Sequence, residues 1–549
     1  MPMNKIFLLS SALSLCLTVV AQPKWAKKTE KAMATLYAIQ QQGDTISAPT
    51  FYIDEQGTAF CALHPLQNAR QAWIQGNDGK TRLVSRIQGF DATYNIARVS
   101  TTGKGKTSFL PLATQKLTKG ETVYLAPKGM EDRIVEQEKA NEYAYYTLSQ
   151  TADVALAGYP LMSAEGQVAG ILQTPIQAHG APFFALDVQL PQSLKITAID
   201  ANASCLRNCH LLKQLPTDES QARSFLYLAH APAEILAAYA EDFIRQFPTS
   251  PTGYIQSAKT SIAQKDYTKA TQTFNEALKS KASPNDEIYF SRAEAIYNYV
   301  LTGDTLQQDW NLQHARQDIE QAIAINPLPL YTHLLARIQF SQQDYASARN
   351  NFIRLTQTNM REPNLFLFAA QCMEREGQAD SLILSLNDSA VACFTRPYTA
   401  EAANALWLRS VRLRQMGKYR DAVRDMNDYE HLMRGRLSDE FYYQRFQAEF
   451  AGRMFAQALE DINKAIELKP DVPLFHAQKA ALLYRTNQTD QAIASCKRTV
   501  QLDAQFADAY RIWGICLRDK GETVQAREQL KKAVELGDTM AQGILDAMK

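Results

Sequence analysis

The sequence lacks an excess of charge of either sign, because 58 Lys and Arg residues against 57 Asp and Glu residues leave a net charge of +1. This balance gives no indication of a nucleic-acid partner, and the absence of a long basic run gives none of a membrane surface. After residue 21 no apolar run is long enough to span a bilayer, so we expect no membrane span in the mature chain. Glycine (23) and proline (21) are ordinary in number for 549 residues, so no long disordered region is expected.

Cysteine is also sparse, with 8 residues in the chain, of which Cys16 lies within the first 21. The other seven are an odd number without dense spacing, which indicates mostly buried free thiols with one local bridge at most. Cys205 and Cys209 could close a small loop. With His210 they form too short a ligand set for zinc, and the remaining histidines show no ligand spacing. We therefore expect no metal and no cofactor.

The first 21 residues have the features of a secretory signal. Lys5 supplies the positive charge, an apolar run follows over 6–20, and Val19-Val-Ala21 is similar to a cleavage site. A membrane anchor is the alternative, although the run is short. A lipidated Cys16 is another, although Leu15 is larger than the small residue such a signal needs. We expect an exported protein, in the periplasm or at the cell surface or outside the cell of a Gram-negative-type bacterium.

The second half of the chain, from Pro251 to Ala533, repeats one motif. An aromatic residue lies three positions before an alanine in the pairs Tyr267 and Ala270, Tyr345 and Ala348, Tyr419 and Ala422, and Phe455 and Ala458. Further copies end at Ala492 and Ala526, and the spacings from Ala422 onward are 36, 34 and 34 residues. Apolar residues follow the alanines by four positions at Phe274, Ile319, Phe352, Met426, Ile462 and Leu530.

A period of about 34 residues resembles the helix–turn–helix unit of tetratricopeptide repeats. In such a unit the small alanine lets two helices approach, the aromatic residue packs between them, and a proline such as Pro327 or Pro470 ends the second helix. We predict that residues 216–549 form an all-α superhelical solenoid of about eight units plus a weaker helical pair over 219–247 that leads into them. The wider interval from Ala270 to Ala315 indicates an insertion near 302–309.

Residues 22–215 have a different pattern, with short β-rich runs separated by turn residues. The predicted strands are Thr50–Ile53, Thr58–Leu63, Gln71–Ile74, Arg82–Gly89, Ile96–Val99, Thr122–Leu125, Gln167–Leu172 and Phe183–Leu186. Asp54-Glu-Gln-Gly57 is a turn signal between the first two of these strands. Many short strands without helical periodicity between them predict a β-barrel or a pair of barrels.

Three segments of this region resemble trypsin-like serine peptidases, particularly the exported bacterial members. The segment Phe51–His64 is similar to the strand–turn–strand that carries the catalytic histidine, and Gly89–Ala97 to the segment of the triad aspartate. The segment Ala155–Ile171 is similar to the one that carries the nucleophile. The resemblance covers about 140 residues and implies a mostly-β double barrel of the trypsin-like fold.

The catalytic residues of that family are absent at two of the three matching positions. His64 stands at the histidine position, Asn95 at the aspartate and Ala157 at the nucleophile. Alanine cannot form an acyl-enzyme, and an amide cannot hold the histidine tautomer as a carboxylate does. Ala155 replaces the glycine that begins the oxyanion-hole turn. Tyr159 replaces another glycine, and we expect it to crowd the cleft. We therefore predict a catalytically inactive peptidase-like domain.

Other nucleophiles are the remaining route to activity. Ser163 follows position 157 by six residues and Ser149 precedes it by eight, so either would have to reach His64 from another strand or loop. Cys61 lies three residues before His64 on an alternating strand and should face the opposite side. An active serine endopeptidase whose repeats recruit substrates is the alternative function.

The repeats predict a protein-binding scaffold, because such arrays present a concave groove lined by the first helix of each unit. Arginine and aromatic side chains suit the binding of a peptide or protein partner. The repeat phase places on the inner face Arg337, Phe340, Trp407, Arg414, Tyr443, Phe450, Tyr484, Arg511 and Arg518. These aromatic residues could equally pack between repeats, and the arginines could form a solvated face. A purely structural surface protein is a third possibility.

Overall fold

The computed structural model describes residues 23–548 except 78, 104, 127–128, 141–142, 152, 174–181, 281–284, 305–306 and 434. The expected secretory signal therefore lies outside the described residues. The chain divides into two compact units, Met1–Ile288 and Tyr289–Lys549. The change from strands to helices near residue 215 thus lies inside the first unit. Among the described residues, no helix combines the length and apolar character needed to cross a membrane.

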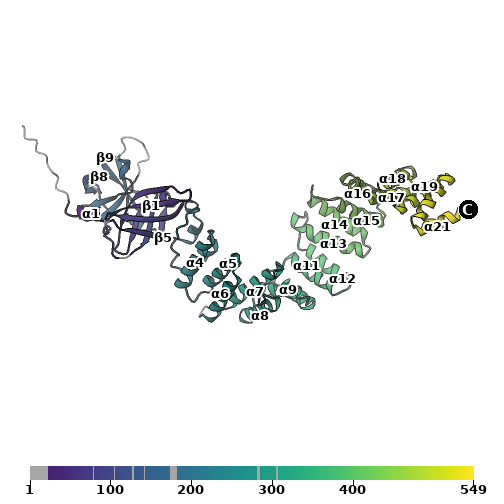
Figure 1. Ribbon diagram of the computed structural model, residues 1–549, viewed down its shortest axis with the longest axis horizontal. Coiled ribbons are helices and arrows are strands. Elements are labelled where there is room, and N and C mark those ends of the chain that lie inside the picture. Colours follow the sequence, from purple (N-terminus) through teal and green to yellow (C-terminus); the bar gives the residue numbers. More distant parts are fainter. Residues whose placement is uncertain are drawn as a thin grey trace, which may run out of the picture. The chain divides into compact units, whose positions relative to one another are not determined.

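The first unit begins with α1 (Ala26–Ala32) and a closed barrel of six described strands (Figure 1). The strands are β1 (Met33–Gln40), β2 (Thr45–Tyr52), β3 (Thr58–Ala62), β4 (Ala69–Gly76), β5 (Thr81–Asp91) and β6 (Ile96–Thr102). They close in the order β1-β2-β3-β6-β5-β4. The predicted turn between β2 and β3 forms because the Asp54 carboxylate accepts the N–H groups of residues 56, 57 and 58.

A second closed barrel follows, again with six described strands. These are β7 (Thr122–Leu125), β8 (Met130–Ala140), β9 (Tyr143–Thr151), β10 (Pro160–Ser163), β11 (Val168–Gln173) and β12 (Pro182–Asp187), in the order β10-β11-β12-β9-β8-β7. The prediction of a mostly-β double barrel is confirmed, although β1, β8, β9 and β10 are strands that the sequence analysis did not predict.

An apolar core joins the two barrels. Phe51 and Phe60 of the first barrel are fully buried together with Met162 and Val168 of the second, and the two phenylalanine rings meet edge to face at 5.9 Å. Each barrel also has its own interior, centred on Leu36, Ile74 and Ile87 in the first and on Tyr146 in the second. The cleft between the barrels is therefore built on a packed base.

Helices α3 (Glu219–Leu228) and α4 (Ala233–Gln246) complete the first barrel, since Phe225 and Phe243 belong to its core. They are the weaker helical pair expected over 219–247. Helices α5 (Pro251–Ala263) and α6 (Tyr267–Lys279) follow in the same unit. Two short helices, η3 (Ala198–Asn202) and η4 (Ser204–Leu206), precede α3. The segment between η4 and α3 is hydrogen bonded to β5, because Ile87 N–H donates to Leu212 O at 2.8 Å.

The second unit consists of helices that pair along the chain (Figure 1). They are α7 (Asp286–Leu301, which begins in the first unit), α8 (Leu312–Ile325), α9 (Pro329–Ser341), α10 (Tyr345–Leu355), α11 (Pro363–Arg375), α12 (Asp380–Val391), α13 (Ala403–Gln415), α14 (Tyr419–Leu432), α15 (Asp439–Ala451), α16 (Phe455–Leu468), α17 (Pro473–Arg485), α18 (Thr489–Leu502), α19 (Ala507–Asp519), α20 (Thr523–Glu535) and α21 (Thr539–Ala547). The prediction of an all-α array is confirmed, and the described helices from α5 to α20 form eight consecutive pairs.

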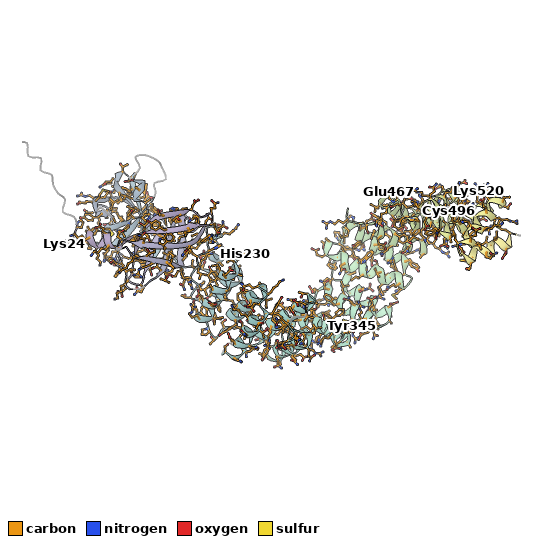
Figure 2. All side chains as sticks on the ribbon, in the orientation of Figure 1. Lys24, His230, Tyr345, Glu467, Cys496 and Lys520 are labelled. Atoms are coloured by element: carbon orange, nitrogen blue, oxygen red, sulfur yellow. The ribbon has the colours of Figure 1, made fainter. Side chains whose placement is uncertain are left out.

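The repeat positions explain why each pair closes. The motif alanines, including Ala348, Ala422 and Ala458, are completely buried, so the two helices of a pair approach closely. The residue that links the helices adopts a left-handed conformation, with φ of 72° at Gly417 but also 64° at Gln343. In Figure 2 Tyr345 marks the start of α10, where Asp344 caps the helix by accepting the N–H of Ser347.

An arginine paired with a buried aspartate recurs in three of the described helix pairs. Arg292, Arg409 and Arg445 each donate from two guanidinium nitrogens to the carboxylate of an aspartate on the following helix, at 2.6–2.9 Å. The partners are Asp318, Asp425 and Asp461, and each follows a motif alanine by three positions. The bidentate geometry fixes the rotation of one helix against the other.

Candidate functional site

A cavity of about 370 Å³ lies between the two barrels. The first barrel contributes residues of β2 and β3 with His64 and Asn95, and the second contributes the turn that contains Ala157, together with β11. The structure thus brings together around one cavity the three positions that the sequence analysis aligned with a catalytic triad. The chemistry of this cavity depends on how these residues are oriented.

Asn95 holds His64 through two contacts. The residue lies in the turn after β5 with φ of 53°, a left-handed conformation that asparagine tolerates better than most residues. Its side-chain Oδ1 accepts the backbone N–H of His64 at 2.8 Å, and its Nδ2 lies 3.2 Å from His64 Nδ1. Because the oxygen faces the backbone N–H, the amide nitrogen must face the ring.

This orientation determines the tautomer of His64. An amide nitrogen can only donate, so Nδ1 must be the acceptor and the ring proton must reside on Nε2. A triad histidine needs the opposite arrangement, in which Nε2 carries the lone pair that accepts the nucleophile's proton. Partial burial also lowers the pKa of His64 below its usual value, which favours the neutral ring at neutral pH. The cavity therefore holds a neutral histidine that presents a donor.

The turn at Ala157 offers neither a nucleophile nor an open pair of donors. The N–H of Ala155 donates to the Asp153 carboxylate at 2.9 Å, and the N–H of Gly158 donates to Leu172 O at 2.7 Å. Gly158 has φ of 85°, and a side chain there would meet Pro49 of β2 at 3.2 Å. Because Ala155 already has a partner, a negatively charged oxygen in the cavity would have at most the N–H of Ala157 to receive it on this turn.

The side chains considered as substitutes are engaged elsewhere. Ser163 is buried on β10 and does not line the cavity, and the Ser149 hydroxyl donates to the Asp132 carboxylate. Cys61 lines the cavity, but burial raises the pKa of its thiol to about 12, so it is not a thiolate at neutral pH. Tyr159, expected to crowd the cleft, instead packs against the cores of the barrels and is not among the lining residues.

The nine array residues predicted for partner binding all lie on described helices, and each has a contact within the second unit. Arg337 lies over the Tyr297 ring, Phe340 packs on Tyr345, and Trp407 on Tyr429 and Phe441. Arg414 donates to Gln444, Tyr443 packs on Phe446 and Phe475, and Phe450 on Phe446 and Phe455. Tyr484 and Arg518 contact Asp519, and Arg511 pairs with Asp508 and Asp538.

A cavity that the sequence analysis did not predict lies among α11, α12 and α13. It has a volume of about 280 Å³. Amide side chains line it together with apolar ones, among them the exposed Phe368 and Leu408. The amides are Asn364, Gln371, Asn387 and Asn404. Asn387 is only 4% exposed, and its side chain has no hydrogen-bond partner within the described residues. Its amide atoms are therefore available to a group that enters the cavity.

The charged side chains in the described lining of this cavity, Glu374 and Arg412, are already paired. Arg412 pairs with both Glu374 and Asp380 at 2.7 Å.

The seven cysteines among the described residues are free thiols, and burial raises the pKa of Cys209 and of Cys516 to about 11. No cluster of three or more potential metal ligands occurs in the described part of the chain.

Comparison with known proteins gives partial matches. No protein-family model matches the chain. Small glutamine-rich tetratricopeptide repeat-containing protein 2 of Mycosarcoma maydis is 34% identical over 82 residues, which are 15% of this chain and 23% of that protein. The chain thus matches less than a quarter of that relative's length.

Among solved structures, YrrB, described as a TPR protein with an unusual peptide-binding site, is similar to 35% of this chain over 94% of its own length. Its sequence identity is 18% and its TM-score 0.30. MamA is similar to 33% of this chain over 94% of its own length, with 18% identity and a TM-score of 0.29.

Proposed function

We propose that this chain is an exported protein-binding scaffold, in which a catalytically inactive, trypsin-like double barrel is fused to a tetratricopeptide-like array that binds peptide or protein partners. The observation that carries the proposal is the contact between Asn95 and His64, in which the amide nitrogen faces Nδ1. This contact supports the inference that His64 cannot act as the general base of a serine peptidase.

Hydrolysis by a trypsin-like mechanism has three requirements at this cavity. The nucleophile needs a hydroxyl, which Ala157 does not have. The histidine needs a free lone pair on Nε2, which the Asn95 amide disfavours. The developing oxyanion needs two converging N–H groups, and one of them, that of Ala155, is bonded to Asp153. Because triad members act as a unit, the loss of several is not rescued by the remaining one.

The array supplies the surface for a partner. In the cavity among α11, α12 and α13, unpartnered amides lie beside exposed apolar side chains, which suits a polypeptide whose backbone is hydrogen bonded and whose apolar side chain is buried. Since Arg412 is already paired twice, the cavity offers no free guanidinium among its described lining for an acidic group. The expected partner segment is therefore uncharged at the position that enters the cavity.

Two experiments test these two parts of the proposal. Fluorophosphonate labelling of the purified mature chain, with His64→Ala as control and mass spectrometry to locate adducts, should give no adduct. A stoichiometric, His64-dependent serine adduct would show an active serine endopeptidase instead.

For the array, random peptides displayed on phage should yield binders to the full chain that are lost in Leu408→Arg but kept in Leu382→Arg. Leu382 is a matched control, because it is an exposed leucine on α12 outside the cavity. Equal loss of binding in both variants, or unchanged binding in both, would contradict the assignment of this cavity.

Export rests on the charged and apolar pattern of the first 21 residues. Expression of the full chain in a Gram-negative host should deliver a shortened protein, cleaved after Ala21, to the periplasmic fraction. Retention of the intact N-terminus in the cytoplasm would contradict this part of the proposal.

A further inference from the structure

A second cavity in the first unit, of about 1000 Å³, contains a buried ammonium group without a counter-ion. It is lined by the turn after β1, by the segment from η3 to Lys213, by the loop between α3 and α4, and by α4. His230, labelled in Figure 2, lies in that loop. This cavity is separate from the one at His64, with no lining residue in common.

Lys213 is held in place by its backbone. Its N–H donates to the Tyr239 hydroxyl at 3.1 Å, and the residues on either side of it are hydrogen bonded to Ile87 of β5. The backbone position of Lys213 is therefore fixed by β5 and by α4. Only 5% of the residue is exposed.

The ammonium of Lys213 is incompletely satisfied. It donates to Ala201 O at 2.8 Å, and no other acceptor is within hydrogen-bond distance among the described residues. No carboxylate of the described chain forms an ion pair with it. Asp200 acts on its charge only from a distance and accepts both the N–H and the hydroxyl of Thr197. Burial lowers the pKa of Lys213 below its usual value. Buried charges in proteins are normally paired, so two unused donors here point to an absent anion.

Arg207 adds a second positive charge to the cavity, whereas no aspartate or glutamate belongs to its described lining. Two histidines, His210 and His230, also line it. Leu206, Pro232 and Ile235 contribute apolar surface to the same cavity. The combination of a fixed cation with apolar surface is typical of sites for small organic anions.

We propose that this cavity binds a small organic carboxylate, whose oxygens accept from Lys213 Nζ and whose apolar body lies against Leu206, Pro232 and Ile235. The carboxylate could belong to a free acid or to the C-terminus of a peptide, and both present the same group to the ammonium. The inference is independent of the scaffold function, because it concerns neither the His64 cavity nor the helices of the second unit.

Calorimetric titration of the full mature chain with 3-phenylpropanoate tests the proposal. The acid should bind with one-to-one stoichiometry, and 3-phenylpropanamide, which has the same body without the charge, should bind at least about tenfold more weakly. A peptide with a free C-terminal phenylalanine and its amidated counterpart form a second arm. Tighter binding of the peptide acid assigns the site to chain termini, and tighter binding of 3-phenylpropanoate assigns it to free acids.

Two variants locate the site. Lys213→Met keeps an unbranched side chain without the charge and should weaken binding of the acid about ten- to a hundredfold, as expected for loss of a charge-assisted hydrogen bond. Lys269→Met, which removes an exposed lysine on α6, should leave it unchanged. If Lys213→Met fails to fold, Ala231→Trp fills the cavity from the loop and should also abolish binding.

Three results would overturn the proposal. They are no binding of either acid to the wild type at millimolar concentration, equal affinity for acid and amide, or unchanged affinity in folded Lys213→Met. Trace acetylation of the wild type provides a check that needs no variant, because bound acid should protect Lys213 and leave Lys269 as reactive as before.

Discussion

Replacing Asn95 by aspartate should reverse the tautomer of His64 and raise its pKa. Aspartate tolerates the left-handed backbone of this turn, so one carboxylate oxygen can still accept the His64 N–H. The other oxygen would then take the place of Nδ2, which lies 3.2 Å from Nδ1, and would accept a proton from the ring.

The size of the shift follows from the distance. A unit negative charge about 4 Å from the protonated ring contributes about 1 kcal/mol in a water-like environment and about 4 kcal/mol at a partly buried protein site. This energy corresponds to a rise of about one to three pKa units. The sign is positive because the carboxylate stabilises only the protonated ring, whereas in the wild type burial lowers the pKa of His64.

Nuclear magnetic resonance of the protein labelled with ¹⁵N-histidine measures both the tautomer and the pKa of His64. Multiple-bond proton–nitrogen spectra should show the proton on Nε2 in the wild type and on Nδ1 in Asn95→Asp, with His64→Gln used for assignment. The control is Asn350→Asp, which adds the same charge to the exposed side of α10. It should change neither the tautomer nor the pKa of His64. A wild-type ring protonated on Nδ1, or a pKa that does not rise in Asn95→Asp, would refute the reasoning and reopen the case for an active peptidase.

Three further predictions concern the helical array. Burial, with the nearby Asp461, raises the pKa of Glu449 to about 8, so the folded state loses stability as the pH rises from 4.5 towards 8. At pH 8, Glu449→Gln should therefore raise the free energy of opening of α15 and α16, measured by hydrogen exchange, by up to about 4 kcal/mol. At pH 5 the same substitution should hardly change it. Gly514→Ala should destabilise α19 and α20 by about 1–2 kcal/mol in the same assay, because the added Cβ would lie 2.6 Å from Leu530 Cγ. Asn387→Leu should change the free energy of unfolding by no more than about 1 kcal/mol, yet abolish peptide binding, because it removes a cavity-lining amide that has no partner within the described chain. Faster exchange in Glu449→Gln at pH 8, unchanged exchange of α19 and α20 in Gly514→Ala, or retained peptide binding in Asn387→Leu would each contradict the corresponding prediction.

The periodic parts of the fold could be predicted from the sequence. Helix pairing depends on local spacing, and the alanines such as Ala348 and Ala458 recur at the interval that brings a small residue to each helix contact. Strands with strong turn signals were predicted for the same reason, for example β2 and β3 on either side of Asp54. By contrast, β8 is rich in charged residues, and its strand conformation is set by its pairing with β7 and β9.

At the site, the sequence determined which chemical groups are present, and the tertiary structure decided what they can do. The absence of a hydroxyl at Ala157 is evident from the sequence alone. The direction of the Asn95 amide is not, because it depends on the backbone N–H of His64, 31 positions away in the chain. Likewise, Lys213 and Asn387 are unremarkable in the sequence, since only the folded chain shows that each is buried beside a cavity without enough partners. Hydrogen-bond satisfaction is a property of neighbours in space, so it becomes visible only when the chain is folded.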